Sequence, residues 1–293
     1  MSLRITSLID PDAHASGQRL AWLAADEDGV PTGHAFLHLF TRPGQAHLAL
    51  LELNVHPAAS DGGTGLRLLD AAVETARDRG RRRIITQVKA GAPAEAFLAA
   101  RDFDRVLTLV SARLSLADLD GAMLDETLAR PHDGYRLTSW EGMVPDELAA
   151  TFVDSRRAMD DTPTGGLNLA AVRWDLARVR AFVESVHKQG DRLHTLVAVD
   201  ESDGAIAGYT ELAVPGDGKG DARHHGTAVL PAHRGRGLGL WMKAAMIRQA
   251  GGRFPHVEGF VTDTADTNPS MTRINRVLGY LPTGVTHEYR LDL

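Results

Sequence analysis

Residues 227–243 read Thr-Ala-Val-Leu-Pro-Ala-His-Arg-Gly-Arg-Gly-Leu-Gly-Leu-Trp-Met-Lys, and this stretch decides the fold. Apolar and β-branched residues run into Pro231, glycines follow at Gly235, Gly237 and Gly239, and an amphipathic pattern then begins. This order predicts a strand, a tight turn and a helix. The first backbone N–H groups of such a helix have no partner within it, so together with the helix dipole they suit a phosphate.

Two well-known phosphate motifs can be tested against the same glycines. A P-loop would continue with Gly-Lys-Ser or Gly-Lys-Thr, whereas here Leu240 and Trp241 follow Gly239. A Rossmann fingerprint needs a further glycine three residues after Gly237, and that residue is Leu240. Both motifs are excluded. A plain strand-to-helix turn that uses glycine for its backbone angles stays open as the alternative for an isolated turn of this kind.

The turn has a counterpart earlier in the chain. Residues 55–66 align without gaps over residues 229–240, and Val, Pro, Ala, two Gly and the final Leu coincide. In both copies a strand signal precedes the turn, an amphipathic helix follows it (66–79 and 238–249), and a further strand comes next (83–88 and 256–261). The sequence therefore predicts one fold present twice.

Length and composition agree with two domains. The chain has 293 residues, 43% of them hydrophobic and 24% charged, which is too long for one ordinary domain. It has no cysteine, which excludes a disulfide framework, a thiolate nucleophile and a zinc site built on sulfur; no metal site is predicted. A net charge of -6 argues against a nucleic-acid partner and favours a cationic or neutral substrate.

Nothing in the sequence indicates a membrane segment or a leader. The first ten residues lack a basic region followed by an apolar one, and nowhere do 18 apolar residues run together. We therefore expect a cytoplasmic protein with no membrane partner, a monomer or a dimer.

Alternating and continuous apolar patterns, with helical patterns between them, predict an α/β fold. Polar and turn-forming residues interrupt the pattern between Leu116 and Tyr135, with room for a short helix. The predicted domains are 1–120 and 135–293, joined by a linker at 121–134. Strands are predicted at 34–40, 47–55, 83–89, 106–114, 194–200, 205–213, 222–230, 256–262 and 284–292.

The stretch from Arg234 to Gly239 resembles the signature of the GNAT acetyltransferase superfamily, which is Arg or Gln, two residues, Gly, one residue, then Gly or Ala. Residues 268–280 resemble the Asn-led helix of the family, which ends in Gly-Phe or Gly-Tyr, and 193–212 resembles its preceding hairpin. The whole chain is similar to the tandem GNAT proteins of actinobacteria, the organisation found in mycothiol synthase. The resemblance implies two tandem domains, each a mixed, mostly antiparallel sheet flanked by helices.

Acetyl-CoA is the acetyl donor that this resemblance implies, held in a V between the parted parallel strands 222–230 and 256–262. The resemblance places the pyrophosphate on the glycine turn and the pantetheine arm along the end of the first strand. Asn268 corresponds to the family residue that approaches pantetheine, and it also fits a simple helix N-cap before Pro269. The cofactor residues so implied are Val229, Leu230, Arg234, Gly235, Arg236, Gly237, Leu238, Gly239 and Asn268.

An amine must lose a proton before it attacks, so the site needs a base. His225 lies four residues before Val229 on one strand face, a spacing similar to that of arylalkylamine acetyltransferases, and Glu211 is the other candidate, acting directly or through water. Either residue could instead be an ordinary strand residue. The family's usual general acid is a Tyr seven residues after its Asn, and that position here is Asn275.

The first copy has lost the charges of the turn. Ser60 and Gly62 replace the two arginines, Asp61 places a carboxylate where a phosphate would bind, and 91–94 replaces the Asn region. We therefore expect residues 1–120 to be a degenerate GNAT domain. In the second copy, Asp160 and Asp161 lie in the loop that forms the acceptor wall in the family; they are candidates for attracting a cationic amine, or simply turn residues.

The leading hypothesis is an acetyl-CoA-dependent N-acetyltransferase that acts on a small-molecule amine by direct transfer in a ternary complex. The alternative is a catalytically weak acyl-CoA-binding or regulatory module, favoured by the missing Tyr.

Overall fold

The computed structural model describes residues 3–9, 17–41, 44–159 and 174–293, with 60–62 described by their backbone alone. The chain forms two compact units. The N-terminal unit comprises the described residues up to 108 together with 285–293, and the C-terminal unit comprises 109–159 and 174–284. Within the described residues, no helix is both long and apolar enough to cross a membrane.

The N-terminal unit is a sheet in the order β1-β2-β3-β4-β5-β12, and only the β4–β5 pair is parallel. Helix α1 covers one face, because its buried residues Leu68, Leu69, Ala72 and Ala76 recur at helical spacing. The elements are β1 (Arg4–Ile9), β2 (Gly17–Ala25), β3 (Pro31–Phe40), β4 (Leu48–Val55), η1 (Pro57–Gly62), α1 (Thr64–Asp78), β5 (Arg83–Lys89), α2 (Ala94–Ala99) and β12 (Leu281–Asp292).

The C-terminal unit is a sheet in the order β6-β11-β10-β9-β8-β7, again with one parallel pair, β10–β11. The elements are β6 (Asp104–Ser115), α3 (Gly121–Ala129), β7 (Tyr135–Glu141), α4 (Asp146–Ser155), η2 (Arg156–Met159), α5 (Leu176–Lys188), β8 (Asp191–Asp200), β9 (Ile206–Pro215), β10 (Gly220–Val229), η4 (Pro231–His233), α6 (Leu238–Arg253), β11 (Val257–Ala265) and α7 (Pro269–Val277).

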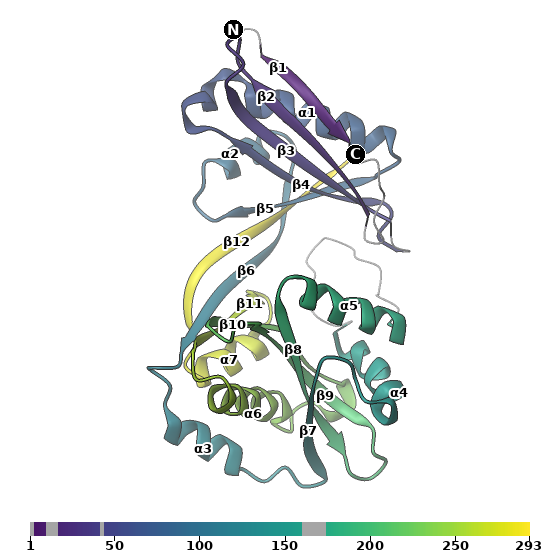
Figure 1. Ribbon diagram of the computed structural model, residues 1–293, viewed down its shortest axis with the longest axis vertical. Coiled ribbons are helices and arrows are strands. Elements are labelled where there is room, and N and C mark those ends of the chain that lie inside the picture. Colours follow the sequence, from purple (N-terminus) through teal and green to yellow (C-terminus); the bar gives the residue numbers. More distant parts are fainter. Residues whose placement is uncertain (1–2, 10–16, 42–43, 160–173) are drawn as a thin grey trace. The chain divides into compact units, whose positions relative to one another are not determined.

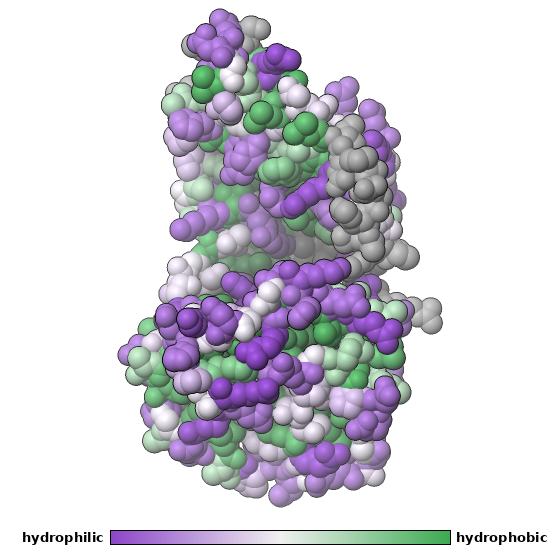
Figure 2. Space-filling view, in the orientation of Figure 1, coloured by the Kyte–Doolittle hydropathy of each residue, from purple (hydrophilic) through white to green (hydrophobic). Residues whose placement is uncertain are grey.

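Helices cover both faces of the C-terminal sheet (Figure 1). On β8, Leu196 and Ala198 belong to the apolar cluster of α6, whereas Val197 and Val199 belong to that of α4 and α5. Successive residues of a strand point to opposite faces, so these two clusters lie on opposite sides of the sheet. On the face shown in Figure 2, apolar residues are scattered among polar ones, as expected when the large apolar clusters lie inside each unit.

All nine predicted strands are present, and α1, α6 and the short helix α3 lie where the sequence indicates them. The boundary between the units is not a single linker at 121–134, because two strands each extend from one unit into the other. Residues 109–115 of β6 pair with β11 in the C-terminal unit, and residues 286–292 of β12 pair with β5 in the N-terminal unit. Each half of the chain therefore supplies the last strand of the other unit's sheet.

Because β12 completes the sheet of the N-terminal unit, a core substitution in β12 should destabilise that unit. Tyr289 is 5% exposed in the core of the N-terminal unit, and its hydroxyl donates to Glu95 Oε2 at 3.0 Å. We expect Tyr289→Ala to cost about 3 kcal/mol or more and to speed amide hydrogen exchange in 84–89 while 206–214 stays protected. Phe260→Ala in the C-terminal core is the matched control and reverses the pattern. If Tyr289→Ala loses protection only in 206–214, the assignment of β12 to the N-terminal unit is wrong.

Candidate active site

The C-terminal sheet opens between β10 and β11. These parallel strands pair only where 220–223 meet 257–261. Beyond that point β10 pairs with β9 up to Val229, and β11 pairs with β6 up to Ala265. The parted strands turn backbone N–H and C=O groups toward a gap instead of toward each other. At its open end lies a cavity of about 800 Å³, lined by the end of β10, the glycine turn and α7.

The glycine turn lies at this cavity and depends on glycine at three positions. Gly235 and Gly237 both have φ of 78°, a backbone conformation that other residues rarely adopt. A Cβ at Gly239 would lie 3.2 Å from Ile274 Cδ1, so glycine there allows α6 to approach α7. Gly237 begins α6 with no side chain capping it. The turn therefore presents open helix-terminal N–H groups, which suit a phosphate.

The two arginines of the turn take different directions. Arg234 lines the cavity, and its Nε donates to Val229 O at 3.0 Å, so the guanidinium spans the end of β10. The Arg236 guanidinium lies over the Tyr135 ring, 5.7 Å from its centroid. Arg234 is therefore the arginine placed to meet an anion on the turn.

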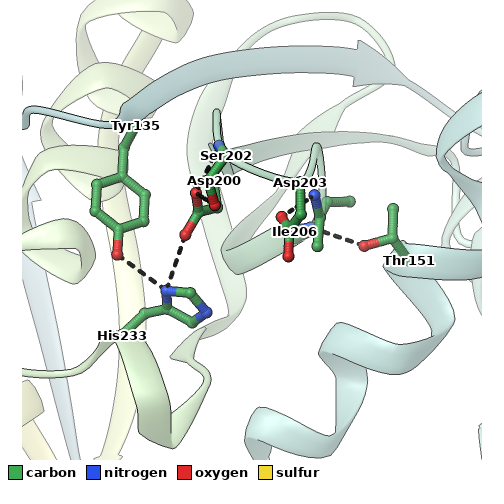
Figure 3. Close-up of polar contacts among 8 residues, drawn as sticks. Tyr135, Thr151, Asp200, Ser202, Asp203, Ile206 and His233 are labelled. Atoms are coloured by element: carbon green, nitrogen blue, oxygen red, sulfur yellow. Dashed lines mark hydrogen bonds and ion pairs between the residues drawn. The ribbon is translucent and has the colours of Figure 1, made fainter.

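His233 joins the turn to β7 and β8 (Figure 3). The Tyr135 hydroxyl and His233 Nδ1 are 2.9 Å apart, and Asp200 Oδ2 lies 3.7 Å from the same nitrogen. Hydrogen bonds from Ser202 hold the pKa of Asp200 below its usual range, so it is ionised near neutral pH. His233 lines the cavity. With Nδ1 facing Tyr135 and Asp200, the ring is held against the wall of the cavity.

The segment predicted as a linker also contributes to the cavity. Arg130 lines it, and His132 stacks on Trp241 of α6 with ring centroids 4.2 Å apart and planes 4° from parallel. A Cβ at Gly237 would lie 3.3 Å from His132 Nε2. Sequence reasoning missed both residues, because no spacing within 121–134 indicates what lies against it.

A bulge in β10 separates two adjacent histidines. His224 pairs with Leu212 of β9 and Gly226 pairs with Glu211, so His225 is an extra residue in the strand. His224 is buried, 7% exposed, beside the rings of Phe260 and Tyr280.

His225 lies against Phe182 of α5, with ring centroids 5.4 Å apart, and its side chain is exposed. Partial desolvation lowers the pKa of His225, the charges of Arg223 and Arg156 lower it further, and the charge of Asp191 opposes this shift. The imidazole is therefore neutral at pH 7 and carries a free lone pair.

Glu211 is held by a buried guanidinium. Arg156 Nη1 donates to Glu211 Oε2 at 2.7 Å, and Nη2 donates to Oε1. Both side chains are at least 96% buried, and the Arg156 guanidinium lies within 6 Å of the ring centroids of Trp174, Tyr209, Phe152 and Phe182. Burial raises the pKa of Glu211, and the charge of Arg156 opposes that shift.

The remaining sequence candidates are placed as follows. Val229, Leu238 and Asn268 line the cavity, and the Asn268 side chain caps α7 by accepting from Met271 N at 3.1 Å. Leu230 packs against the cluster of α4 and α5. Asp160 and Asp161 lie outside the described residues.

The N-terminal unit keeps the same opening between β4 and β5. These strands pair only at 48–50 with 83–85, and a cavity of about 390 Å³ lies beyond. Gly63 at the start of α1 has φ of 72°, like Gly237. The pairing of β3 with β4 is regular, however, so β4 has no bulge and no counterpart of His225.

Comparisons with known proteins agree with this geometry. The model of the Acetyltransferase (GNAT) family matches residues 5–103 and 158–280, more than half of the chain. No curated protein matches the chain in sequence.

Among solved structures, a tandem GNAT protein from the clavulanic acid biosynthesis pathway is 25% identical, with a TM-score of 0.74 over 96% of this chain and 84% of that one. A GCN5-related N-acetyltransferase from Sphaerobacter thermophilus shares the fold at 16% identity, with a TM-score of 0.70 over 93% and 80%. The parted strands, the glycine turn and these matches together place the chain in the GNAT family of acetyltransferases, as a tandem GNAT protein.

Proposed function

We propose that the C-terminal unit is an acetyl-CoA-dependent N-acetyltransferase that acts on a small-molecule amine by direct transfer in a ternary complex. The observation that carries the proposal is the gap between β10 and β11, which ends at a glycine turn with open N–H groups. Acetyl-CoA supplies the activated acetyl group. The chain has no cysteine, so no enzyme thiol could carry that group on its way to the acceptor.

The turn from Gly235 to Gly239 binds the pyrophosphate through backbone N–H groups, and Arg234 adds a positive charge beside it. The unpaired backbone of β10 bonds to the pantetheine amides, and a β10 N–H polarises the thioester carbonyl as negative charge develops on its oxygen. His225 accepts the proton that the amine must lose before it attacks. The side of the sheet on which α5 and Phe182 meet His225 is therefore the acceptor side. Asp160 and Asp161 stay candidates for attracting a cationic amine.

The N-terminal unit keeps the gap but has lost the groups that would use it. Asp61 falls within its turn sequence and Glu52 lines its cavity, so this unit has acidic residues, and no arginines in the turn, to offer an anion. We therefore propose one acetyl-CoA site per chain.

Matched substitutions in the two turns test the cofactor site. Gly235 and Gly63 both have positive φ and open space where a Cβ would stand, so Asp strains both backbones equally. We expect Gly235→Asp to weaken acetyl-CoA binding at least about tenfold, because a carboxylate would face the pyrophosphate, and Gly63→Asp to leave it within about threefold. Titration calorimetry measures both affinity and stoichiometry. Equal effects of the two substitutions, or two sites per chain, contradict the proposal.

The base assignment predicts a pH dependence. Because its pKa is lowered, His225 is neutral at pH 7, so turnover should fall only when the pH drops below the usual range of a histidine. His225→Gln should lower kcat by about 10²–10⁴-fold, remove this acidic limb and leave acetyl-CoA affinity unchanged. The measurement is kcat against pH with a panel of amines. If the acidic limb is unchanged in His225→Gln, another residue is the base. If the wild type binds acetyl-CoA but transfers acetyl to no amine, the result favours the regulatory module.

The role of Glu211 is tested by substituting Arg156, its ion-pair partner. Arg156→Leu leaves a buried carboxylate without its cation and should cost about 3–5 kcal/mol, whereas Arg156→Leu with Glu211→Leu should recover most of the loss. Hydrogen exchange of the β9 amides reports the stability of this region. Turnover by the folded double variant within about tenfold of wild type gives Glu211 a structural role. Loss of turnover with the fold intact makes Glu211 the base.

A further inference from the structure

A buried lysine and a buried asparagine meet behind the gap of the C-terminal unit. Lys243 of α6 is 1% exposed, and its Nζ donates to Asn275 Oδ1 of α7 at 2.5 Å. Asn275 Nδ2 donates in turn to Thr264 Oγ1 of β11 at 3.0 Å, and the ammonium lies 4.4 Å from the centroid of the Tyr280 ring. A lysine is almost never fully buried without an anionic partner, so its place here calls for an explanation.

The N-terminal unit shows where these two positions lie relative to the gap. In the alignment of the turns, Leu69 occupies the position of Lys243. The backbone bond from Phe103 N to Leu98 O matches that from Tyr280 N to Asn275 O, so Leu98 occupies the position of Asn275. Leu69 and Leu98 both line the cavity between the parted strands of their unit. Lys243 and Asn275 therefore lie at the inner wall of the corresponding gap, where the N-terminal unit is apolar.

A third buried polar group, His224, stands at this wall. Its side chain is 7% exposed, and the backbone of Glu211 is the polar group beside its imidazole. His224 directly follows Arg223, the last residue of β10 that pairs with β11, so it stands where the strands part.

The length of the strand places the thioester at the same point. From Arg223 to Val229, β10 lies opposite six residues of β9 because His225 is inserted, so it covers five steps of about 3.3 Å, or roughly 17 Å. A pantetheine arm has about as many chain bonds as four residues, which extend to roughly 14 Å. An arm whose phosphate is bound on the glycine turn therefore carries its sulfur to the region where the strands part.

We propose, resting on the function proposed above, that Lys243 donates a proton to the CoA thiolate as it leaves and that Asn275 positions the ammonium for this step. When the carbon–sulfur bond breaks, the sulfur keeps the bonding pair. One N–H bond of Lys243 then breaks and an S–H bond forms, which leaves a neutral amine that regains its proton from water once the products have left. No oxidant, reductant or further co-reactant is needed.

The electrostatics of the cluster suit a proton donor at neutral pH. Burial lowers the pKa of Lys243 to about 7, so the group both holds and releases a proton under ordinary conditions. The titratable groups that face it are His224 and Tyr280. Burial and the nearby Lys243 charge hold the pKa of His224 well below its usual value, and burial raises that of Tyr280, so both are neutral near pH 7.

The N-terminal unit also supplies the variants for the test. Lys243→Leu with Asn275→Leu copies the apolar wall that Leu69 and Leu98 form, and so gives a variant designed to fold. Lys243→Arg keeps a positive charge that does not titrate near pH 7. Lys219→Met, at an exposed lysine of the same unit, is the matched control.

The first readout is the titration of Lys243 itself. The chain has only four lysines, so carbon-13 NMR of labelled lysine Cε groups can assign the Lys243 signal by its absence in Lys243→Leu. We expect that signal to titrate near pH 7 in the full chain, and the other three in the usual lysine range. A Lys243 signal that titrates with the other three overturns the proposal.

The second readout is turnover against pH, with acetyl-CoA affinity measured by calorimetry. A donor must be protonated, so wild-type kcat should fall as the pH rises through the pKa of Lys243. The double variant and Lys243→Arg should lose about a hundredfold or more in kcat, lack this basic limb and bind acetyl-CoA within about threefold of wild type. Lys219→Met should behave as wild type.

Different results would overturn the proton-donor role and the proposed function. If wild type transfers acetyl groups and the Lys243 variants keep both kcat and the basic limb, the donor role is wrong and the N-acetyltransferase stands. If wild type binds acetyl-CoA but transfers to no amine, the proposed function and the donor role fall together.

Discussion

The separation of β10 from β11 is the constraint on which the rest of the C-terminal unit depends. A parallel pair normally satisfies its backbone groups along its whole length, and here it does so only at 220–223. The remaining backbone is held in place from outside, by β9 on one strand and β6 on the other. The open edges thus form part of a rigid sheet, so they are positioned for an extended polar ligand before it arrives.

The two faces of the gap have different chemistry, and the bulge in β10 produces the difference. Because His225 is an inserted residue, consecutive histidines lie in different surroundings, His224 with Phe260 and Tyr280 and His225 with Phe182. A thioester bound between the strands would have a neutral base on one side and a lysine on the other. The N-terminal unit has the same framework without the bulge, and its wall carries Leu69 and Leu98. The working features of one unit are thus small changes to a scaffold that both share.

Patterns local in sequence predicted much of this structure. The glycine turn, its strand and helix, and the repeat at 55–66 follow from spacing alone. Strands β1 and β7 were missed because polar residues such as Thr6, Ser7 and Ser139 interrupt their apolar pattern. Strand β2 was missed too, and its apolar run is rich in alanine, which is depleted in strands. Contacts between distant segments could not be predicted, since spacing does not show that His132 stacks on Trp241 or that Arg156 pairs with Glu211. For the same reason the pairing of Lys243 with Asn275 could not be predicted. The sequence showed only that Asn275 stands where the family usually has a tyrosine.

The strands β6 and β12 have a consequence for synthesis. A ribosome makes a chain from its N-terminus, and a domain folds once all of its parts have emerged. The sheet of the N-terminal unit includes residues 286–292, so it cannot be completed until the segment that forms the C-terminal unit has been made. Until then β5 presents an unpaired edge, the kind of surface that attracts other strands. The order of translation and the order of folding are thus opposed in this protein, and the N-terminal unit is finished last.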